Sequence, residues 1–141
     1  MSVTLTAICD AITAHLEDAT GIARAQSYDE LTEGMNTLPT IQVYPQSGST
    51  EQVTFRQVVR KHAALIHVDL YAMQRSDLAG NMGKLVELID AIQTELEKEN
   101  EGPLFGVSGV QWGPWRWERV TFDAGQVQYV GARFYLDLKL Y

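Results

Sequence analysis

The sequence predicts an α+β fold, in which a mainly antiparallel, twisted sheet carries two helices packed on one face. Two segments repeat apolar side chains every three or four residues, as amphipathic helices do. Other segments alternate apolar with mixed residues, which is typical of strands in a sheet with one covered face. The order of these segments contains no repeat and no boundary, so residues 1–141 are expected to form a single domain.

The first predicted helix covers residues 4–19. Ser2 or Thr4 can cap its start, and Gly21 stands where helices commonly end. Its apolar stripe consists of Leu5, Ile8, Ile12 and Leu16.

Residues 22–28 are expected to form a short strand, and the polar segment 29–39 a loop. The β-rich residues 40–44 form the next strand, which Pro45 should end because proline cannot donate to a strand ladder. A polar segment rich in glycine and serine follows and extends to Arg56. We expect it to be a loop that is mobile in the free subunit and becomes ordered against a neighbouring subunit. The residues of this assembly loop are Gln46, Ser47, Gly48, Ser49, Thr50 and Glu51.

The clearest predicted strand covers residues 57–73. Its even-numbered residues are uniformly apolar and should face the core: Ala64, Ile66, Val68, Leu70 and Ala72. The second helix should follow Ser76, which can act as N-cap with Asp77 in the first turn. Its apolar seam, about 21 residues long, comprises Leu78, Met82, Leu85, Ile89, Ile92 and Leu96.

The C-terminal part should return to strands, at residues 107–111, 115–122 and 127–140. Gly113 and Pro114 should separate the first two strands. Residues 123–126 should form a hairpin turn, with Gly125 available for a positive φ.

The odd-numbered faces of the two longest strands, which mix polar and apolar residues, are expected to contact a partner. Residues 61–73 and 127–140 could each reach about 40 Å, whereas a typical strand has only about 5–6 residues. No third helix is predicted that could cover their odd-numbered residues, whose polar and aromatic composition is typical of interfaces. We therefore expect other subunits to cover Leu65, Tyr71, Met73, Tyr129, Tyr135 and Tyr141, beside Arg133, Asp137 and Lys139. Charge reversal at Arg133 or Asp137 should leave the monomer folded but disturb assembly.

All three tryptophans fall within residues 111–122. Trp115, Trp117, Arg119 and Thr121 would share one strand face, and Arg116, Glu118, Val120 and Phe122 the other. Three interpretations stay open for the tryptophans: packing within the chain's own fold, anchoring a subunit interface, or stacking against sugars or bases. Bases would also require basic neighbours, and this chain is acidic.

No catalytic or metal-binding signature is present. G-x-S-x-G, P-loop, G-x-G-x-x-G and H-E-x-x-H motifs are absent, so we expect no enzyme and no cofactor. His67 and Asp69 point the same way on one strand, but a metal site would need a third converging ligand. We interpret them as a surface histidine beside a carboxylate. The acidic residues Glu95, Glu97, Glu99 and Glu101 are interpreted as a solvated helix end.

The chain has 18 acidic and 11 basic residues and a formal charge of −7. Tight phosphate binding needs clustered Lys and Arg, so storage on DNA is not expected. Cys9 is the only cysteine, which leaves no internal disulfide and no cysteine metal cluster. The chain has no apolar run of about 20 residues and no basic segment at its start, so we expect cytosolic synthesis and no membrane partner.

The chain as a whole resembles the tail terminator, or tail completion, proteins of long-tailed bacteriophages. The resemblance covers nearly the full length and rests on the order, size and texture of the elements, without a diagnostic motif. The segments that carry it are "LPTIQVYP", "AALIHVDLYAM", "LVELIDAIQTELE" and the closing "WERVTFDAGQVQYVGARFYLDLKLY".

The resemblance implies a structural virion protein without catalytic residues. Six copies would form a ring that caps the tail tube, ends tube growth and gives the head or neck a docking surface. The partners would be the tail tube protein and a head completion or neck protein. Genome DNA would only pass through the lumen, and six copies with a formal charge of −42, six times −7, would repel it. Assembly would occur in the host cytoplasm, and the ring would lie at the head-proximal end of the tail.

Other functions stay open. A head–tail connector or a tail tube protein would have a similar size, but a tube protein should polymerise where a terminator stops at a ring or stays monomeric. A carbohydrate-binding module would use the tryptophan strip. An enzyme would require a converging polar pocket.

Overall fold

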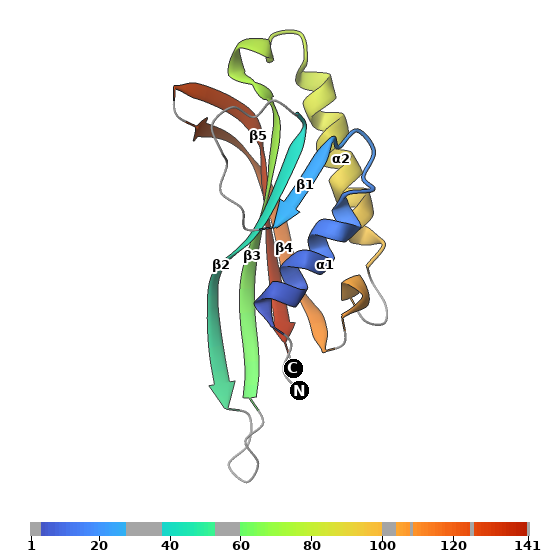
Figure 1. The fold of residues 1–141 in the computed structure, drawn as a ribbon, viewed down its shortest axis with the longest axis vertical. Helices are drawn as coiled ribbons and strands as arrows, with labels where there is room; N and C mark the ends of the chain where they lie inside the picture. Colours follow the sequence, from blue (N-terminus) through green and yellow to red (C-terminus); the bar gives the residue numbers. More distant parts are fainter. Residues whose placement is uncertain are drawn as a thin grey trace.

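The computed structural model describes residues 4–27, 38–52, 60–99, 104–107, 109–124 and 126–140. The elements are α1 (Leu5–Leu16), β1 (Arg24–Ser27), β2 (Thr40–Gln52), β3 (Arg60–Gln74), η1 (Arg75–Asp77), α2 (Met82–Glu97), η2 (Leu104–Gly106), β4 (Val110–Ala124) and β5 (Val127–Leu140). The strands form one sheet in the order β1-β2-β3-β5-β4 (Figure 1). β1 is parallel to β2 and all other neighbours are antiparallel, so the predicted α+β class and mainly antiparallel sheet are confirmed.

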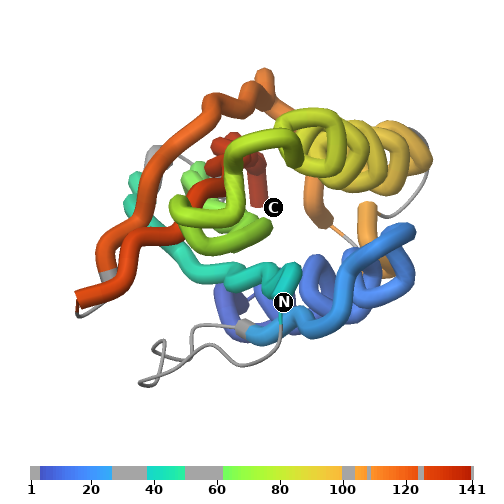
Figure 2. Tube along the Cα trace, turned by 90° about the horizontal axis from the view of Figure 1, so that it is seen from above, coloured from blue at the N-terminus to red at the C-terminus, as the bar shows by residue number. Residues whose placement is uncertain are grey.

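Both helices pack against the sheet, and their apolar stripes share one core with the even-numbered residues of β3 and β5 (Figure 2). In α1 three of the four predicted stripe residues face this core, since Ile8, Ile12 and Leu16 are fully buried. The inclusion of Leu5 was wrong, because Leu5 is 43% exposed. Thr4 is the N-cap, and its side-chain oxygen accepts a hydrogen bond from the backbone N–H of Ala7 at 3.1 Å. The alternation predicted for the two long strands directs their apolar residues to one face of the sheet. Both helices therefore pack on that face.

The second helix is shorter than its apolar spacing suggests. Residues 75–77 form the separate 3-10 turn η1, and α2 begins only at Met82 and has 16 residues. Gly80 has a φ of +77°, and this left-handed conformation breaks the chain between the two helical segments. The prediction that Ser76 caps the second helix was therefore wrong. The buried stripe of α2 comprises Leu85, Leu88, Ile89, Ile92 and Leu96.

β2 does not end at Pro45, as the sequence suggested, but continues to Gln52 in antiparallel pairing with β3. The register shifts between Pro45 and Ser47, which leaves Gln46 in a bulge. Proline is tolerated here because β1 pairs only with residues 40–43, so this part of β2 is an edge strand next to a bulge.

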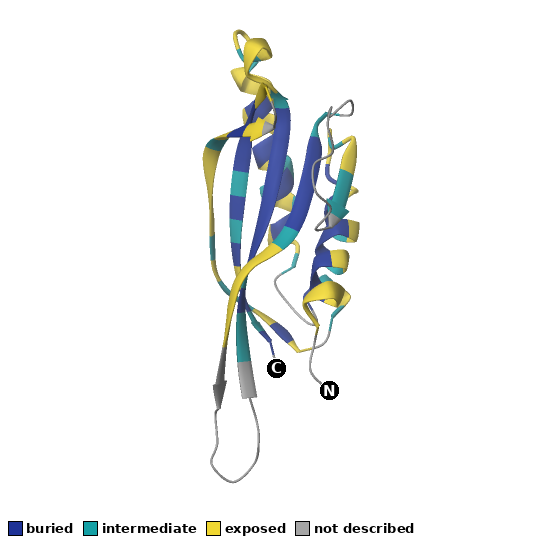
Figure 3. Ribbon diagram, turned by 60° about the vertical axis from the view of Figure 1, so that its left-hand side comes forward, coloured by how far each residue is buried: buried dark blue, intermediate teal, exposed yellow. Residues whose placement is uncertain are grey.

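The segment predicted as an assembly loop is therefore strand, since residues 46–51 all lie in β2. β2 is buried at residues 40–43 and exposed at residues 45–49, as Figure 3 shows. Residues 53–56, which complete the predicted mobile segment, lie outside the described residues. The role of this segment in assembly stays a prediction.

The tryptophan segment forms one bent strand rather than two. β4 runs without interruption from Val110 to Ala124, and its register against β5 shifts between Trp112 and Trp115. Gly113 and Pro114 occupy this bulge, which bends the strand without ending it. The predicted hairpin is confirmed, but its turn does not include all of residues 123–126, because Asp123 and Ala124 belong to β4 and pair with Gln128 and Val127.

The free end of the β4–β5 hairpin bends to one side of the sheet (Figure 1). At this level the register between β3 and β5 shifts between Tyr71 and Met73. Gly131 permits the close approach of the strands, because a Cβ atom there would lie 1.6 Å from the backbone oxygen of Leu70.

The bend of the β4–β5 hairpin buries part of the sheet face that we expected to be uncovered within one subunit. Tyr71 and Tyr129 are only 5% and 3% exposed, and Phe122 stacks on Tyr71 with ring centroids 4.1 Å apart. Leu38 and Val120 pack against this aromatic cluster. The expectation that the two tyrosines lie uncovered within one subunit was wrong, because the hairpin of the same chain covers them.

Candidate functional site

The face of the sheet opposite the helices is called the open face below. Two cross-strand rows of side chains run over it, and the strand registers define them. The first row is Tyr44, His67, Tyr135 and Arg116, and the second is Gln42, Asp69, Arg133 and Glu118. The sequence predicted His67, Asp69, Arg133 and Tyr135 on this face but did not single out Tyr44. The alternation of residues 40–44 was the pattern that could have placed Tyr44 on this face.

Asp69 is the centre of the second row and is only 2% exposed. Its carboxylate accepts hydrogen bonds from Arg133, from Nε at 2.8 Å and from Nη2 at 3.2 Å, and from the Tyr44 hydroxyl at 2.7 Å. A carboxylate removed from water is stable only with such donors. The interpretation of His67 and Asp69 as a surface pair was wrong, because neighbouring side chains cover both.

His67 lies between two aromatic rings and is 6% exposed. The rings of Tyr44 and Tyr135 stand edge-on to it at centroid distances of 5.4 and 4.8 Å. The Tyr44 hydroxyl proton is directed at Asp69, so the 3.2 Å contact between Tyr44 and Nδ1 of His67 requires the imidazole to donate. Burial lowers the pKa of His67, with the charge of Arg133 acting in the same direction, and the ring is therefore neutral at pH 7.

Arg133 is held by the carboxylate beneath it. The hydrogen bonds that Arg133 donates to Asp69 raise the pKa of Arg133, and its guanidinium also lies 5.6 Å from the ring centroid of Phe122. Its side chain is 29% exposed, so it reaches solvent only in part. Arg133 therefore organises the open face, and its charge is already matched inside the subunit.

An exposed rim flanks this buried network on β4. The Tyr135 hydroxyl donates to Oε1 of Glu118, and this hydrogen bond lowers the pKa of Glu118 and raises that of Tyr135. The Arg116 guanidinium lies 3.9 Å from the ring centroid of Tyr135 and 3.6 Å from Oε2 of Glu118. Exposed ion pairs of this kind contribute little to stability. Arg116 and Glu118 can therefore exchange their contacts for those of a partner at small cost.

A groove of about 240 Å³ opens beside this rim. It is lined by Leu65, Pro114, Trp115, Arg116, Tyr135 and Asp137. Its volume lies below the roughly 300–1,000 Å³ that is typical of small-molecule sites.

The residues predicted as a subunit interface divide between the two faces of the sheet. Leu65, Tyr135 and Asp137 line the open-face groove, and Arg133 lies beside it. Trp117 and Arg119 belong to the opposite, helix-covered face, since Trp117 lies near core residue Phe134. The predicted strand alternation is correct, but the predicted set does not form one continuous surface.

The tryptophans have different environments. The indole N–H of Trp112 donates to the backbone oxygen of Glu99, and Trp112 and Trp115 both pack against the main core. Trp117 is 41% exposed. A flat strip of two exposed tryptophans, as stacking against sugars would need, is not formed by Trp115 and Trp117.

A second exposed region, the α2–β4 patch, consists of Met82, Val86, Trp117 and Arg119. The three apolar residues are 39%, 48% and 41% exposed in that order. Nη1 of Arg119 lies 3.7 Å from Sδ of Met82, so the start of α2 and this part of β4 are in contact here. Exposed large apolar side chains gathered at one place are typical of contact surfaces.

The acidic end of α2 is more than a solvated helix end. Nδ1 of His15 lies 3.3 Å from Oε1 of Glu99, and Nε2 of His15 lies 2.7 Å from the backbone oxygen of Glu95. Oε2 of Glu99 also accepts the backbone N–H of Phe105. These contacts join the C-terminal ends of α1 and α2, so the two glutamates have a structural role that the sequence pattern did not indicate.

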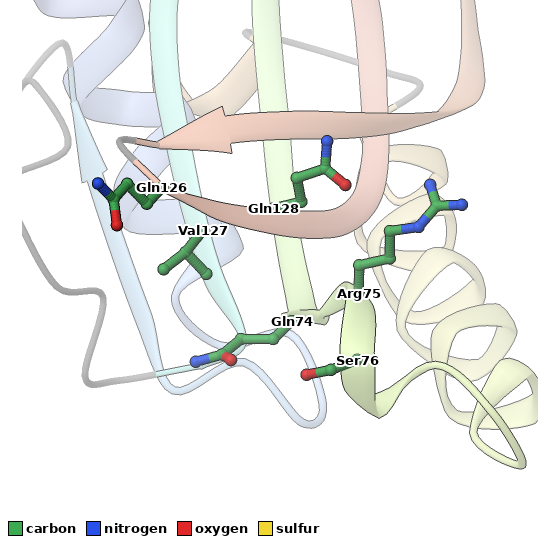
Figure 4. Close-up of a pocket in the computed structure, with 6 residues that line it drawn as sticks. All are labelled: Gln74, Arg75, Ser76, Gln126, Val127 and Gln128. Atoms are coloured by element: carbon green, nitrogen blue, oxygen red, sulfur yellow. The ribbon is translucent and has the colours of Figure 1, made fainter.

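A polar groove of about 580 Å³ lies where the hairpin end approaches the end of β3 (Figure 4). Its lining residues are Gln74, Arg75, Ser76, Gln126, Val127 and Gln128. These side chains can exchange hydrogen bonds with a ligand, but no pair among them has the form of a nucleophile with its base.

In the described part of the chain, no three His, Cys, Asp or Glu side chains are grouped as metal ligands. Neither α1 nor α2, the helices that the structure describes, has the length and apolar character needed to span a bilayer. No protein-family model matches the chain, and no curated protein matches it in sequence.

Proposed function

We propose that the protein is a tail terminator of a long-tailed bacteriophage. In this proposal six copies form a ring that caps the tail tube, ends tube growth and gives the head or neck a docking surface. The observation that carries it is the open face, where a buried polar network supports an exposed aromatic and charged rim beside a groove. A surface of this composition is typical of protein interfaces. The six-fold ring is proposed from the resemblance in element order, size and texture to tail terminators.

Identical neighbours would join head to tail, because such contacts close into rings when the rotation between copies fits. The partners at the two sides of the ring would be the tail tube protein and a head completion or neck protein. Genome DNA would cross the lumen without binding, since a ring of chains that each carry −7 repels it. The protein would act at the head-proximal end of the tail in the virion.

Electron microscopy and native mass spectrometry of the purified protein across a concentration series test this proposal. We expect closed six-fold rings of about 95 kDa, six times the 15.8 kDa chain, in equilibrium with monomer. Gold-labelled antibody should mark the head-proximal end of the tail on particles. Open filaments would instead indicate a tube protein. A monomer at every concentration, with no label on particles, would overturn the proposal.

A variant in the open-face groove tests the function in assembly. Asp137 is exposed, and Asp137→Lys should leave the monomer folded but yield tails of uncontrolled length that lack heads. Glu87→Lys makes the same charge change at an exposed position of α2 and serves as the control. Normal tails from Asp137→Lys particles would show that this groove is not an assembly surface.

A further inference from the structure

The sheet has a free edge on each side. β1 pairs with residues 40–43 alone, so β2 from Tyr44 onward has a strand partner only in β3. β4 pairs with β5 on one side and is the last strand of the sheet on the other. Within the described residues, both stretches therefore leave backbone N–H and C=O groups on their outer sides without a strand partner, which is a template for pairing with another chain.

The directions of the strands allow these edges to pair with each other. β2, β3, β5 and β4 alternate in direction, because each neighbouring pair is antiparallel. With four strands in this series, β2 and β4 run in opposite directions. A second copy placed beside β4 in the same orientation would therefore present its β2 antiparallel to β4. The alternation then continues from copy to copy without interruption.

The side chains at these edges suit close contact. Edge strands usually carry charges, prolines or bulges that prevent pairing. β2 has Pro45 and the bulge at Gln46, but residues 47–50 beyond them carry no charge. The small residues Ser47, Gly48 and Ser49 are exposed there and leave room for a neighbouring strand. On β4 the α2–β4 patch lies directly beside the edge, and its exposed Trp117 is of the type that anchors interfaces.

We propose that copies of this chain join by main-chain pairing between the free edge of β2 in one copy and the free edge of β4 in the next. This inference rests on the proposed ring and names the contact that closes it. The contact is head to tail, as ring closure requires, because each copy contributes two different edges. It also assigns the α2–β4 patch to the same interface, since an added strand beside β4 would cover Trp117.

Disulfide trapping between copies tests the pairing in a Cys9→Ser background. Ser47 and Ser49 are paired with Leu65 and Ala63 and so project to the open face, as Arg116 and Glu118 do. The four combinations of one cysteine from each pair sample three antiparallel registers, because Ser47 opposite Glu118 and Ser49 opposite Arg116 belong to the same one, and directly opposed residues bring Cβ atoms within disulfide reach.

Ser49→Cys combined with Arg119→Cys is the matched control, because these two side chains project to opposite faces. At least one open-face combination should give a ladder of covalent oligomers that ends at six copies, with at least tenfold more product than the control. Rings without any such ladder would overturn the β2–β4 contact in these three registers and leave the proposed function standing. Neither rings nor ladder would overturn both.

A pair of proline variants gives an independent test. Of two successive residues in β4, one directs its N–H toward β5 and the other toward the free edge. Glu118→Pro and Arg119→Pro should therefore differ: one loses stability, and the other stays folded but loses at least nine-tenths of its rings. Circular dichroism identifies the folded variant. Undiminished rings from that variant would refute the pairing.

Discussion

Arg133 and Asp137 offer a matched test of how the open face is built. Both lie on β5 and on the same face, four residues apart, and the sequence suggested that charge reversal at either would leave the monomer folded. The structure separates them. Arg133 pairs with the buried Asp69, whereas Asp137 is exposed at the groove. We now expect Arg133→Met to destabilise the fold and Asp137→Lys to leave its stability within about 0.5 kcal/mol.

The loss in free energy of unfolding expected for Arg133→Met follows from the contacts that Arg133 makes. The change removes two hydrogen bonds, at 2.8 and 3.2 Å, from a carboxylate that is 2% exposed. Breaking a buried ion pair costs about 3–5 kcal/mol. The Arg133 side chain is 29% exposed, so water can replace part of the loss, and we expect about 2–4 kcal/mol. The midpoint of thermal unfolding should fall by about 5–15 °C for a chain of this length.

Chemical denaturation followed by circular dichroism measures this difference directly. Methionine keeps the apolar stem of the side chain, so the loss reports the charge pair rather than packing. Arg133→Glu should lose more stability than Arg133→Met, because it places a second carboxylate beside Asp69. Equal unfolding midpoints for Arg133→Met and the unchanged protein would refute the view that this pair supports the open face.

Three further outcomes are expected. His67 has a lowered pKa in the fold, so the unfolded chain binds the proton first, and stability should fall as pH drops below about 6.5; denaturation at pH 7.5 and 5.5 should show a drop that His67→Gln reduces. Gly131→Ala should cost at least about 1–3 kcal/mol, since its Cβ would meet backbone, whereas Gly83→Ala, with open space around it, should gain up to about 1 kcal/mol in the same assay. Trp112→Ala should lower the unfolding midpoint more than Trp117→Ala, which should chiefly weaken rings in native mass spectrometry; equal midpoints would contradict the different burial of the two side chains.

Local pattern was sufficient for the elements that bury one face. The spacing of Ile8, Ile12 and Leu16 predicted α1, and the alternation along β3 and β5 predicted which residues enter the core. These patterns are informative because a helix or strand with one buried face must repeat its apolar residues with its own period. The same alternation correctly divided the residues of β4 between the two faces.

Proline and glycine residues were wrongly expected to end strands at positions where pairing with a neighbouring strand continues past them. Pro45 and the Gly113–Pro114 pair were interpreted as strand ends, yet Pro45 directly precedes a bulge and Gly113–Pro114 occupy one, each within a continuous strand. The partner strand supplies hydrogen bonds on both sides of a bulge, and no local pattern reports that partner. Conversely, the apolar spacing before Met82 suggested helix, but the left-handed Gly80 interrupts it.

By itself, the sequence determined the fold class, most of the core residues and the composition of a second face that resembles an interface. Only the tertiary structure decided which part of that face the chain covers itself. The hairpin bend buries Tyr71 and Tyr129, and the strand registers bring Tyr44 and Arg133 onto Asp69. These contacts join residues that lie 25 to 64 positions apart. The alternation along a strand predicts to which face of the sheet a side chain projects. The register and curvature of the whole sheet determine which other residues that side chain contacts.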